Sequence, residues 1–139
     1  MSLELMEAFY RSPTVPRFRP HEHLKRPADF QAAYDRRRSA ADNTLVVYAR
    51  ENGLPHSRVG LSVSRKFGTA VRRNRIRRLM REAFRLTKDD LPKGFDFVLI
   101  PRPLDDYSLE SIQASLVKLV RQAVRKIERE AVPAKEPAP

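Results

Sequence analysis

The sequence RKFGTAVRRNRIRRLMREAFR, residues 65–85, predicts the element around which the rest of the chain is arranged. From about Ala70 its apolar residues recur at spacings of three to five, which is typical of a helix with one buried side. These residues can share one stripe: Val71, Ile76, Leu79, Met80, Ala83 and Phe84. Arg73, Arg77 and Arg81 are four positions apart, so they stack on another face. The stretch therefore predicts an amphipathic helix with a strongly basic side.

The charge on this helix has one sign. Residues 65–81 contain eight Lys or Arg residues and no acid. Like charges one turn apart repel by about 0.2–0.5 kcal/mol per pair in an isolated helix, so an anionic partner would stabilise the arrangement. Phosphate is the obvious partner, because guanidinium groups match its geometry in bidentate fashion. The alternative is a solvated charged face, which is what most charge runs are.

The composition of the whole chain favours a nucleic-acid partner. Its 139 residues include 28 Lys and Arg against 17 Asp and Glu, a net charge of +11. Such a positive field attracts RNA, DNA or an anionic membrane. A membrane surface is disfavoured, because Phe84 is the one large aromatic residue on the apolar side of the basic helix. A hydrophobic fraction of 41% indicates one folded domain rather than a basic disordered chain.

Several segment types are not found in the sequence. There is no cysteine, which excludes disulfides and thiolate metal sites and is compatible with the cytoplasm. No apolar run approaches the ~20 residues that span a bilayer. The N-terminal sequence lacks a basic leader followed by an apolar block, so we expect no secretory signal. We therefore expect a cytoplasmic protein without a membrane partner.

Three stretches read as β-strands. Residues 44–50, TLVVYAR, alternate so that Leu45 and Tyr48 face opposite sides. Residues 58–64, RVGLSVS, follow a turn that contains Asn-Gly and a proline, which predicts a hairpin between these two strands. Residues 95–101, FDFVLIP, are almost continuously apolar and predict a buried central strand. Residues 39–43 read as a polar break.

Two more helices flank these strands. One begins at Pro27 and carries Phe30 and Tyr34 one turn apart, and spacing alone favours both rings as core residues. The other is a long amphipathic helix from about Leu109 to Ala131, which Asp105, Asp106 or Ser108 can cap. The order is αββαβα, an α+β fold with helices packed on a small, mostly antiparallel sheet. We assign 1–23 to a flexible, basic, proline-containing arm, 24–131 to one RNA-binding domain, and 132–139 to a disordered tail.

The segment VGLSVSRKFGTAVRRNRIRRLMREAFR closely resembles the characteristic motif of the bacterial ribonuclease P protein subunit. That motif combines a lysine, a glycine and an alanine ahead of an Arg-Asn-Arg core, followed by a basic pair and a further arginine. In this chain the matching positions are Lys66, Gly68, Ala70, Arg73, Asn74, Arg75, Arg77, Arg78 and Arg81. The resemblance extends over about residues 24–131. It implies a fold like the second domain of a small-subunit ribosomal protein, with the basic helix as a crossover between strands.

The resemblance also implies a function. Members of this family are the non-catalytic partners of a catalytic RNA that uses Mg²⁺ to remove the 5′ leader from precursor tRNA. It implies that the catalytic RNA is contacted by Lys66, Arg73, Asn74, Arg75, Arg77, Arg78 and Arg81. It implies that the leader is held by Phe30, Tyr34 and Tyr48 together with Arg65 and Lys66, so the rings that spacing assigns to the core become cleft residues. Such rings stack on the bases of single-stranded RNA. No catalytic residue is expected in the protein, and no metal ligand is assigned.

Three rival functions remain at this stage. A structural, ribosomal-type RNA-binding protein would share the charge and the fold without promoting leader removal. A protein-only nuclease would need convergent carboxylates, and the acids of this chain are spread over loops, helix starts and solvated faces. A DNA-binding helix is disfavoured only modestly by the aromatic and basic pattern. The expected partners are the catalytic RNA and precursor tRNA, with no obligate protein partner.

Overall fold

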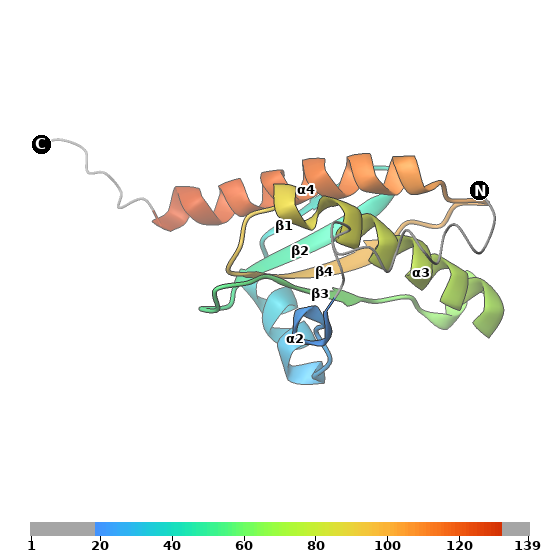
Figure 1. Cartoon of the computed structure of the whole chain (residues 1–139), viewed down its shortest axis with the longest axis horizontal. Coiled ribbons are helices and arrows are strands. Elements are labelled where there is room, and N and C mark those ends of the chain that lie inside the picture. The colour runs from blue at the N-terminus through green and yellow to red at the C-terminus, as the bar shows by residue number, and fades with distance from the viewer. Residues whose placement is uncertain (1–18, 132–139) are drawn as a thin grey trace, which may run out of the picture.

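The computed structural model describes residues 19–131, which form three α-helices and a four-stranded sheet. Figure 1 shows the sheet with helices on both sides. In chain order the elements are α2 (Pro27–Arg36), β1 (Ser39–Ala41), β2 (Leu45–Glu51), β3 (Arg58–Leu61), α3 (Ala70–Thr87), β4 (Phe95–Pro101) and α4 (Leu109–Ala131), with short 3-10 turns η1 (Pro20–Glu22), η2 (Arg65–Phe67) and η3 (Lys88–Asp90). The predicted α+β class is confirmed, and α3 is the basic crossover helix between β3 and β4.

β4 lies inside the sheet, between β2 and β3, in the strand order β1-β2-β4-β3. It pairs antiparallel with β2 and parallel with β3. The predicted hairpin between residues 44–50 and 58–64 is therefore wrong. The turn exists, with Gly53 at a φ of 70°, but the two strands that it connects, β2 and β3, lie on opposite edges of β4. An almost wholly apolar strand is buried best with a neighbour on each edge, which explains the insertion.

A short edge strand, β1, was not predicted. Its three residues pair antiparallel with β2, with Ala40 opposite Val47. Ser and Ala have little intrinsic preference for strands, so the sequence alone reads as a break. The neighbouring strand supplies the hydrogen-bonding partner that sets the conformation.

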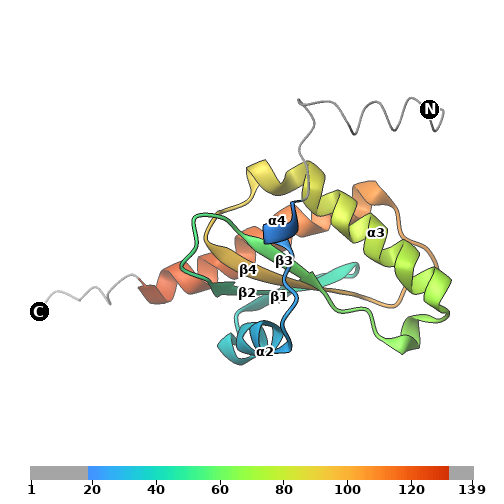
Figure 2. The same ribbon diagram turned by 60° about the horizontal axis from the view of Figure 1, so that its bottom comes forward.

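The two faces of the sheet carry different layers, as Figures 1 and 2 show. α3 and α4 cover one face and enclose the main core, in which the β2 residues Leu45, Val47 and Ala49 are fully buried. α2 covers part of the other face over a smaller cluster that contains Leu24, Ala33 and Val98. The predicted alternation along β2 is confirmed. Within residues 19–131, no helix is both long and apolar enough to cross a bilayer.

α3 buries most of its predicted apolar stripe. Thr69 caps the helix, because its side-chain oxygen accepts a hydrogen bond from the Arg72 N–H at 3.2 Å. Ile76, Met80, Ala83 and Phe84 are buried, but Val71 is 80% exposed. The assignment of Val71 to the stripe is wrong. Val71 lies five positions before Ile76, which is about 140° around a helix.

The described fold begins before the predicted domain start at residue 24. Pro20–Glu22 form η1, and His23 bridges to Val59 of β3. Glu22 is buried and pairs with Lys88 at 3.0 Å. These contacts attach the end of the predicted arm to the domain. The rest of that arm, residues 1–18, and the predicted tail, residues 132–139, lie outside the described residues.

Candidate nucleic-acid interface

The predicted RNA-binding residues of α3 lie on three sides of the helix. Arg77 and Arg81 line a pocket on the side of α2, whereas Arg72 and Arg75 line pockets toward the loop before α4. Asn74, Arg78 and Val71, which was assigned to the apolar stripe, are exposed on the outer surface between them. The motif is therefore spread around the exposed circumference of the first three turns. It offers contacts in several directions at once.

The side toward α2 forms a small cleft of about 100 Å³. Its lining combines an aromatic ring, aliphatic groups and two cations: His23, Leu24, Phe30, Val59, Gly60, Leu61, Arg77 and Arg81. Gly60 is what allows the ring to lie against β3, because a Cβ atom at this position would come within 2.5 Å of Phe30 Cζ. The structure thus brings the predicted leader-binding Phe30 together with Arg77 and Arg81, which were assigned to the catalytic RNA.

The other two predicted rings lie beside each other further along the same sheet face. The rings of Tyr34 and Tyr48 meet edge to face with centroids 5.1 Å apart. Both are partly buried and, with Phe30, pack against the smaller core cluster. The rings were assigned to the core from spacing and to a cleft from the family resemblance. Each ring packs against the core on one side and keeps an exposed part.

His23 adds an uncharged group to the cleft. Burial, followed by the positive charges of Arg81 and Lys25, lowers the pKa of His23 below its usual value. The ring is then neutral at pH 7, so the positive charge of this cleft comes from its arginines.

Hydrogen bonds hold several α3 side chains in place. Arg77 donates to Asn74 Oδ1 at 3.0 Å, and Arg73 Nε donates to the Gly68 carbonyl at 3.3 Å. Arg75 meets Asp106 at 3.8 Å, with the two side chains 72% and 81% exposed, so this pair contributes little. Within the part of the chain that the structure describes, Arg78 and Arg81 form no ion pair, and their charges are available to a partner.

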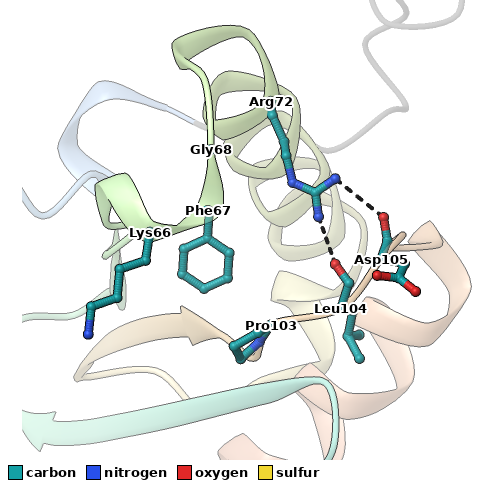
Figure 3. Close-up of a pocket in the computed structure, with 7 residues that line it drawn as sticks. All are labelled: Lys66, Phe67, Gly68, Arg72, Pro103, Leu104 and Asp105. Carbon is teal, nitrogen blue, oxygen red and sulfur yellow. Dashed lines mark hydrogen bonds between the residues drawn. The ribbon is translucent and has the colours of Figure 1, made fainter.

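Arg65 and Lys66 lie on η2 and do not line the Phe30 cleft. Lys66 lines a separate pocket with Phe67, Gly68 and Arg72 (Figure 3). Arg65 and Lys66 were predicted to bind the leader together with the three rings, but they do not share a pocket with Phe30. Arg72, which was not singled out, donates to the carbonyl oxygens of Leu104 at 2.7 Å and Asp105 at 3.3 Å. Its position within the basic stretch 65–81 was the one sequence feature that could have singled out Arg72.

A buried charge cluster under α2 supports the aromatic face and was missed from the sequence. Asp96 of β4 has no exposed surface and accepts two hydrogen bonds from Arg58, at 2.8 and 2.7 Å, and one from Arg50 at 2.9 Å. Asn52 donates a fourth at 3.0 Å. Asp29 of α2 lies 3.6 Å from Arg50 and 3.7 Å from Arg58, so the cluster also ties the helix to the sheet.

The electrostatics of this cluster follow from the pairing of the strands. Arg50 and Arg58 both lie directly opposite Asp96, one on each neighbouring strand. Burial acts to raise the pKa of Asp96, but the hydrogen bonds from Arg58, Asn52 and Arg50 outweigh it and lower the pKa below the usual value. The carboxylate is therefore ionised at neutral pH. Knowledge of the strand order would have been needed to find it.

The described residues contain no set of three or more His, Cys, Asp or Glu side chains arranged to hold a metal ion. We therefore assign no metal ligand among residues 19–131.

An exposed, one-signed cationic helix beside an aromatic cleft is the arrangement typical of small nucleic-acid-binding proteins. Comparison with known proteins specifies the group: the chain belongs to the Ribonuclease P family, whose model matches residues 18–124. It is 43% identical to the ribonuclease P protein component of Pelotomaculum thermopropionicum over 101 residues, covering 72% of this chain and 90% of that protein.

Solved structures agree with the family assignment. The ribonuclease P protein of Thermotoga maritima superposes with a TM-score of 0.66 at 37% identity, covering 72% of this chain and 96% of the other. That of Staphylococcus aureus gives a TM-score of 0.64 at 38% identity, covering 72% and 93%.

Proposed function

We propose that this chain is the protein component of a ribonuclease P, which binds a catalytic RNA and the 5′ leader of precursor tRNA during removal of that leader. The observation that carries the proposal is the cleft between α2 and α3. It places the ring of Phe30 beside the guanidinium groups of Arg77 and Arg81. Single-stranded RNA is commonly bound by this combination of a stacking surface and a cationic track.

In this proposal the leader lies along the sheet face next to α2. Its bases stack on the exposed parts of Phe30, Tyr34 and Tyr48, and each such base contributes about 1–3 kcal/mol. Arg77 and Arg81 hold its phosphates. The surface recognises the leader through rings and phosphates rather than base edges, so it accepts leaders of many sequences.

The catalytic RNA contacts the outer side of α3. Asn74 and Arg78 are exposed there, and we assign Lys66, Arg73 and Arg75 to the same partner. Contacts of this kind bind the RNA backbone and orient the protein without reading sequence. Because Arg77 and Arg81 face the cleft, we assign them to the leader first and to the catalytic RNA where the two RNAs approach each other.

We assign the chemistry to the RNA. Mg²⁺ held by the RNA would activate water and stabilise the charge that develops on the phosphate. The protein binds and orients the leader beside that centre. We place the complex in the cytoplasm, with no membrane or obligate protein partner.

Cleavage of a 5′-extended precursor tRNA at low Mg²⁺ tests the proposal. The protein alone, a bacterial ribonuclease P RNA alone and the pair are compared, each with a leader-bearing and a leaderless tRNA in the binding assay. We expect efficient cleavage from the pair only, and a binding benefit from the protein that requires the leader. Cleavage by the protein alone would overturn the assignment of chemistry to the RNA. RNA binding without any effect on cleavage would support a structural RNA-binding protein instead.

A further inference from the structure

η2 and the loop that precedes α4 line an open pocket of about 590 Å³ (Figure 3). It shares no residue with the Phe30 cleft. Its lining comes from two segments far apart in sequence: Lys66, Phe67, Gly68 and Arg72 on one side, and Pro103, Leu104 and Asp105 on the other.

The walls of this pocket combine charged side chains with partly exposed apolar ones, Phe67, Pro103 and Leu104. Phe67 is half-buried and packs against the main core, so its ring is held in place while part of it remains accessible. Figure 3 shows the ring close to Pro103, with Lys66 on one side and Arg72 on the other. Leu104 is 37% exposed. Exposed apolar side chains gathered in one pocket mark a binding site more often than scattered ones do.

The two cations beside the pocket differ in their contacts: Arg72 is held by hydrogen bonds, whereas Lys66 is available to bind the phosphate of a nucleotide. The two hydrogen bonds from Arg72 to the carbonyls of Leu104 and Asp105 hold the loop against α3. Lys66 is exposed and, among residues 19–131, forms no ion pair, so its ammonium group can contact a phosphate. Asp105 also lines the pocket, and its carboxylate would repel a phosphate placed there but can accept an N–H from a base.

We propose that this pocket binds a single nucleobase from an unpaired stretch of RNA. The base stacks on Phe67 beside Pro103 and Leu104, its edge faces Asp105, and its phosphate lies toward Lys66. An aromatic ring with an adjacent cation is the common means of binding an unstacked base. The proposal rests on the RNA-binding function proposed above. It adds a second point of base contact, on a different side of α3 from the Phe30 cleft.

Substitutions in the full-length protein test the pocket. Phe67→Leu removes the aromatic face, Phe67→Tyr keeps it, and Leu104→Ser removes an exposed apolar wall without touching the core. Leu54→Ser is the matched control, because Leu54 is also 37% exposed but lies elsewhere. For each variant, we would measure the dissociation constant of the protein for a ribonuclease P RNA transcript. We would also measure the dissociation constant of the assembled protein–RNA complex for precursor tRNA with a leader and for tRNA without one. Thermal unfolding reports whether the variant is folded.

We expect Phe67→Leu and Leu104→Ser to weaken binding of one RNA, the former by about tenfold, while Phe67→Tyr and Leu54→Ser bind like the wild type. The salt dependence of binding stays unchanged in Phe67→Leu, since stacking releases no counterions, and falls in Lys66→Gln. A loss confined to leader-bearing tRNA identifies a leader base as the occupant. A loss confined to the transcript identifies a base of the catalytic RNA.

Wild-type affinity of both Phe67→Leu and Leu104→Ser for both RNAs would overturn the pocket proposal while leaving the proposed function intact. If Phe67→Leu does not fold, Leu104→Ser decides. Failure of the wild-type protein to bind either RNA would overturn the proposed function, and this proposal with it.

Discussion

Asp96 joins three strands through one fully buried carboxylate, and its arginine partners in turn pair with Asp29 of α2. Replacing Asp96 by Asn keeps the shape but leaves the more distant Asp29, at 3.6 Å from Arg50 and 3.7 Å from Arg58, as their counter-charge among the described residues. Removing one partner of a buried ion pair costs about 3–5 kcal/mol, and the partial exposure of both arginines reduces this, so we expect Asp96→Asn to lower the free energy of unfolding by about 2 kcal/mol. Urea denaturation at pH 7 measures it.

Asp106→Asn is the control for this substitution. Asp106 also meets an arginine, Arg75, but at 3.8 Å and with 81% of its side chain exposed. We expect a change below about 0.5 kcal/mol. Equal, small changes in the two variants would show that the buried cluster does not stabilise the sheet.

Gly60 sets how closely α2 approaches β3. A Cβ atom there would lie 2.5 Å from Phe30 Cζ and 2.8 Å from Phe30 Cε1. We expect Gly60→Ala to push the ring away from the strand, to destabilise the protein by about 1–3 kcal/mol, and to weaken leader binding. Denaturation together with leader-dependent tRNA binding measures both effects.

A double-mutant cycle with Phe30→Leu separates the contact from other effects of the new methyl group. With the ring removed, Gly60→Ala should cost less, although the approach to Leu24 Cβ at 3.0 Å then remains, so the two substitutions should be non-additive. Additive costs would mean that Phe30 is not what the methyl group meets.

At the scale of elements, α3 is expected to bind RNA through local phosphate contacts on its outer side. Arg78→Ala should weaken binding of a ribonuclease P RNA transcript and reduce the slope of log K against log salt by about 0.7–0.9, the value for one lost phosphate contact. Binding measured between low and moderate salt gives the slope.

Arg125→Ala on the exposed side of α4 is the matched control. It removes the same charge from the molecule, so it reports the effect of the overall field without the local contact. We expect its slope to match the wild type. The same slope change in both variants would mean that α3 acts through net charge alone.

The helices were predictable because each carries its own signals. α2 begins at Pro27, α3 from Ala70 follows its apolar spacing, and Ser108 caps α4 by accepting a hydrogen bond from the Ser111 N–H at 3.1 Å. β4 was predicted as a buried central strand for a similar reason, its continuous apolar run. These signals are local, so one sequence is enough to find them.

The strand order and the shape of the site were not predictable from the same information. A tight turn between two strands favours a hairpin, and nothing near that turn shows that β4, more than thirty residues later, separates them. The buried cluster of Asp96 depends on that order and was missed. The cleft shared by Phe30 and Arg77 also depends on it, and the two residues were assigned to different RNAs. The roles of the individual RNA-binding residues stay predictions.

For the whole molecule, acid stability depends on carboxylates whose pKa values are lowered by folding. Burial raises the pKa of Asp42, but hydrogen bonds from Ser115, from the backbone N–H groups of Leu45 and Thr44, and from Lys118 lower it to about 2. The hydrogen bond from Arg38 lowers the pKa of Glu130 to about 2. The pKa values of Glu22, Glu51 and Asp96 are lowered as well.

A carboxylate with a lower pKa in the folded state stabilises the fold above its unfolded pKa of about 4 and loses that effect as the pH falls through the folded value. We therefore expect a stability plateau above about pH 5 and a decline from about pH 4 to pH 2. Urea denaturation across this range measures it. Asp42→Asn should lower the plateau and flatten the decline, and Lys118→Ala should do so less, because three other donors to Asp42 remain. An unchanged decline in Asp42→Asn would contradict this account.

The place of β4 inside the sheet also matters for the order in which the protein is made. The ribosome synthesises β2, β3 and the whole of α3 before it reaches Phe95, the first residue of β4. Until then β2 and β3 lack the strand that joins them, and their open edges can pair with other chains. The cationic helix is complete while the sheet that it packs against is still missing. A nascent chain that stalls before residue 95 would thus carry the cationic side of α3 among cellular polyanions before the domain can fold.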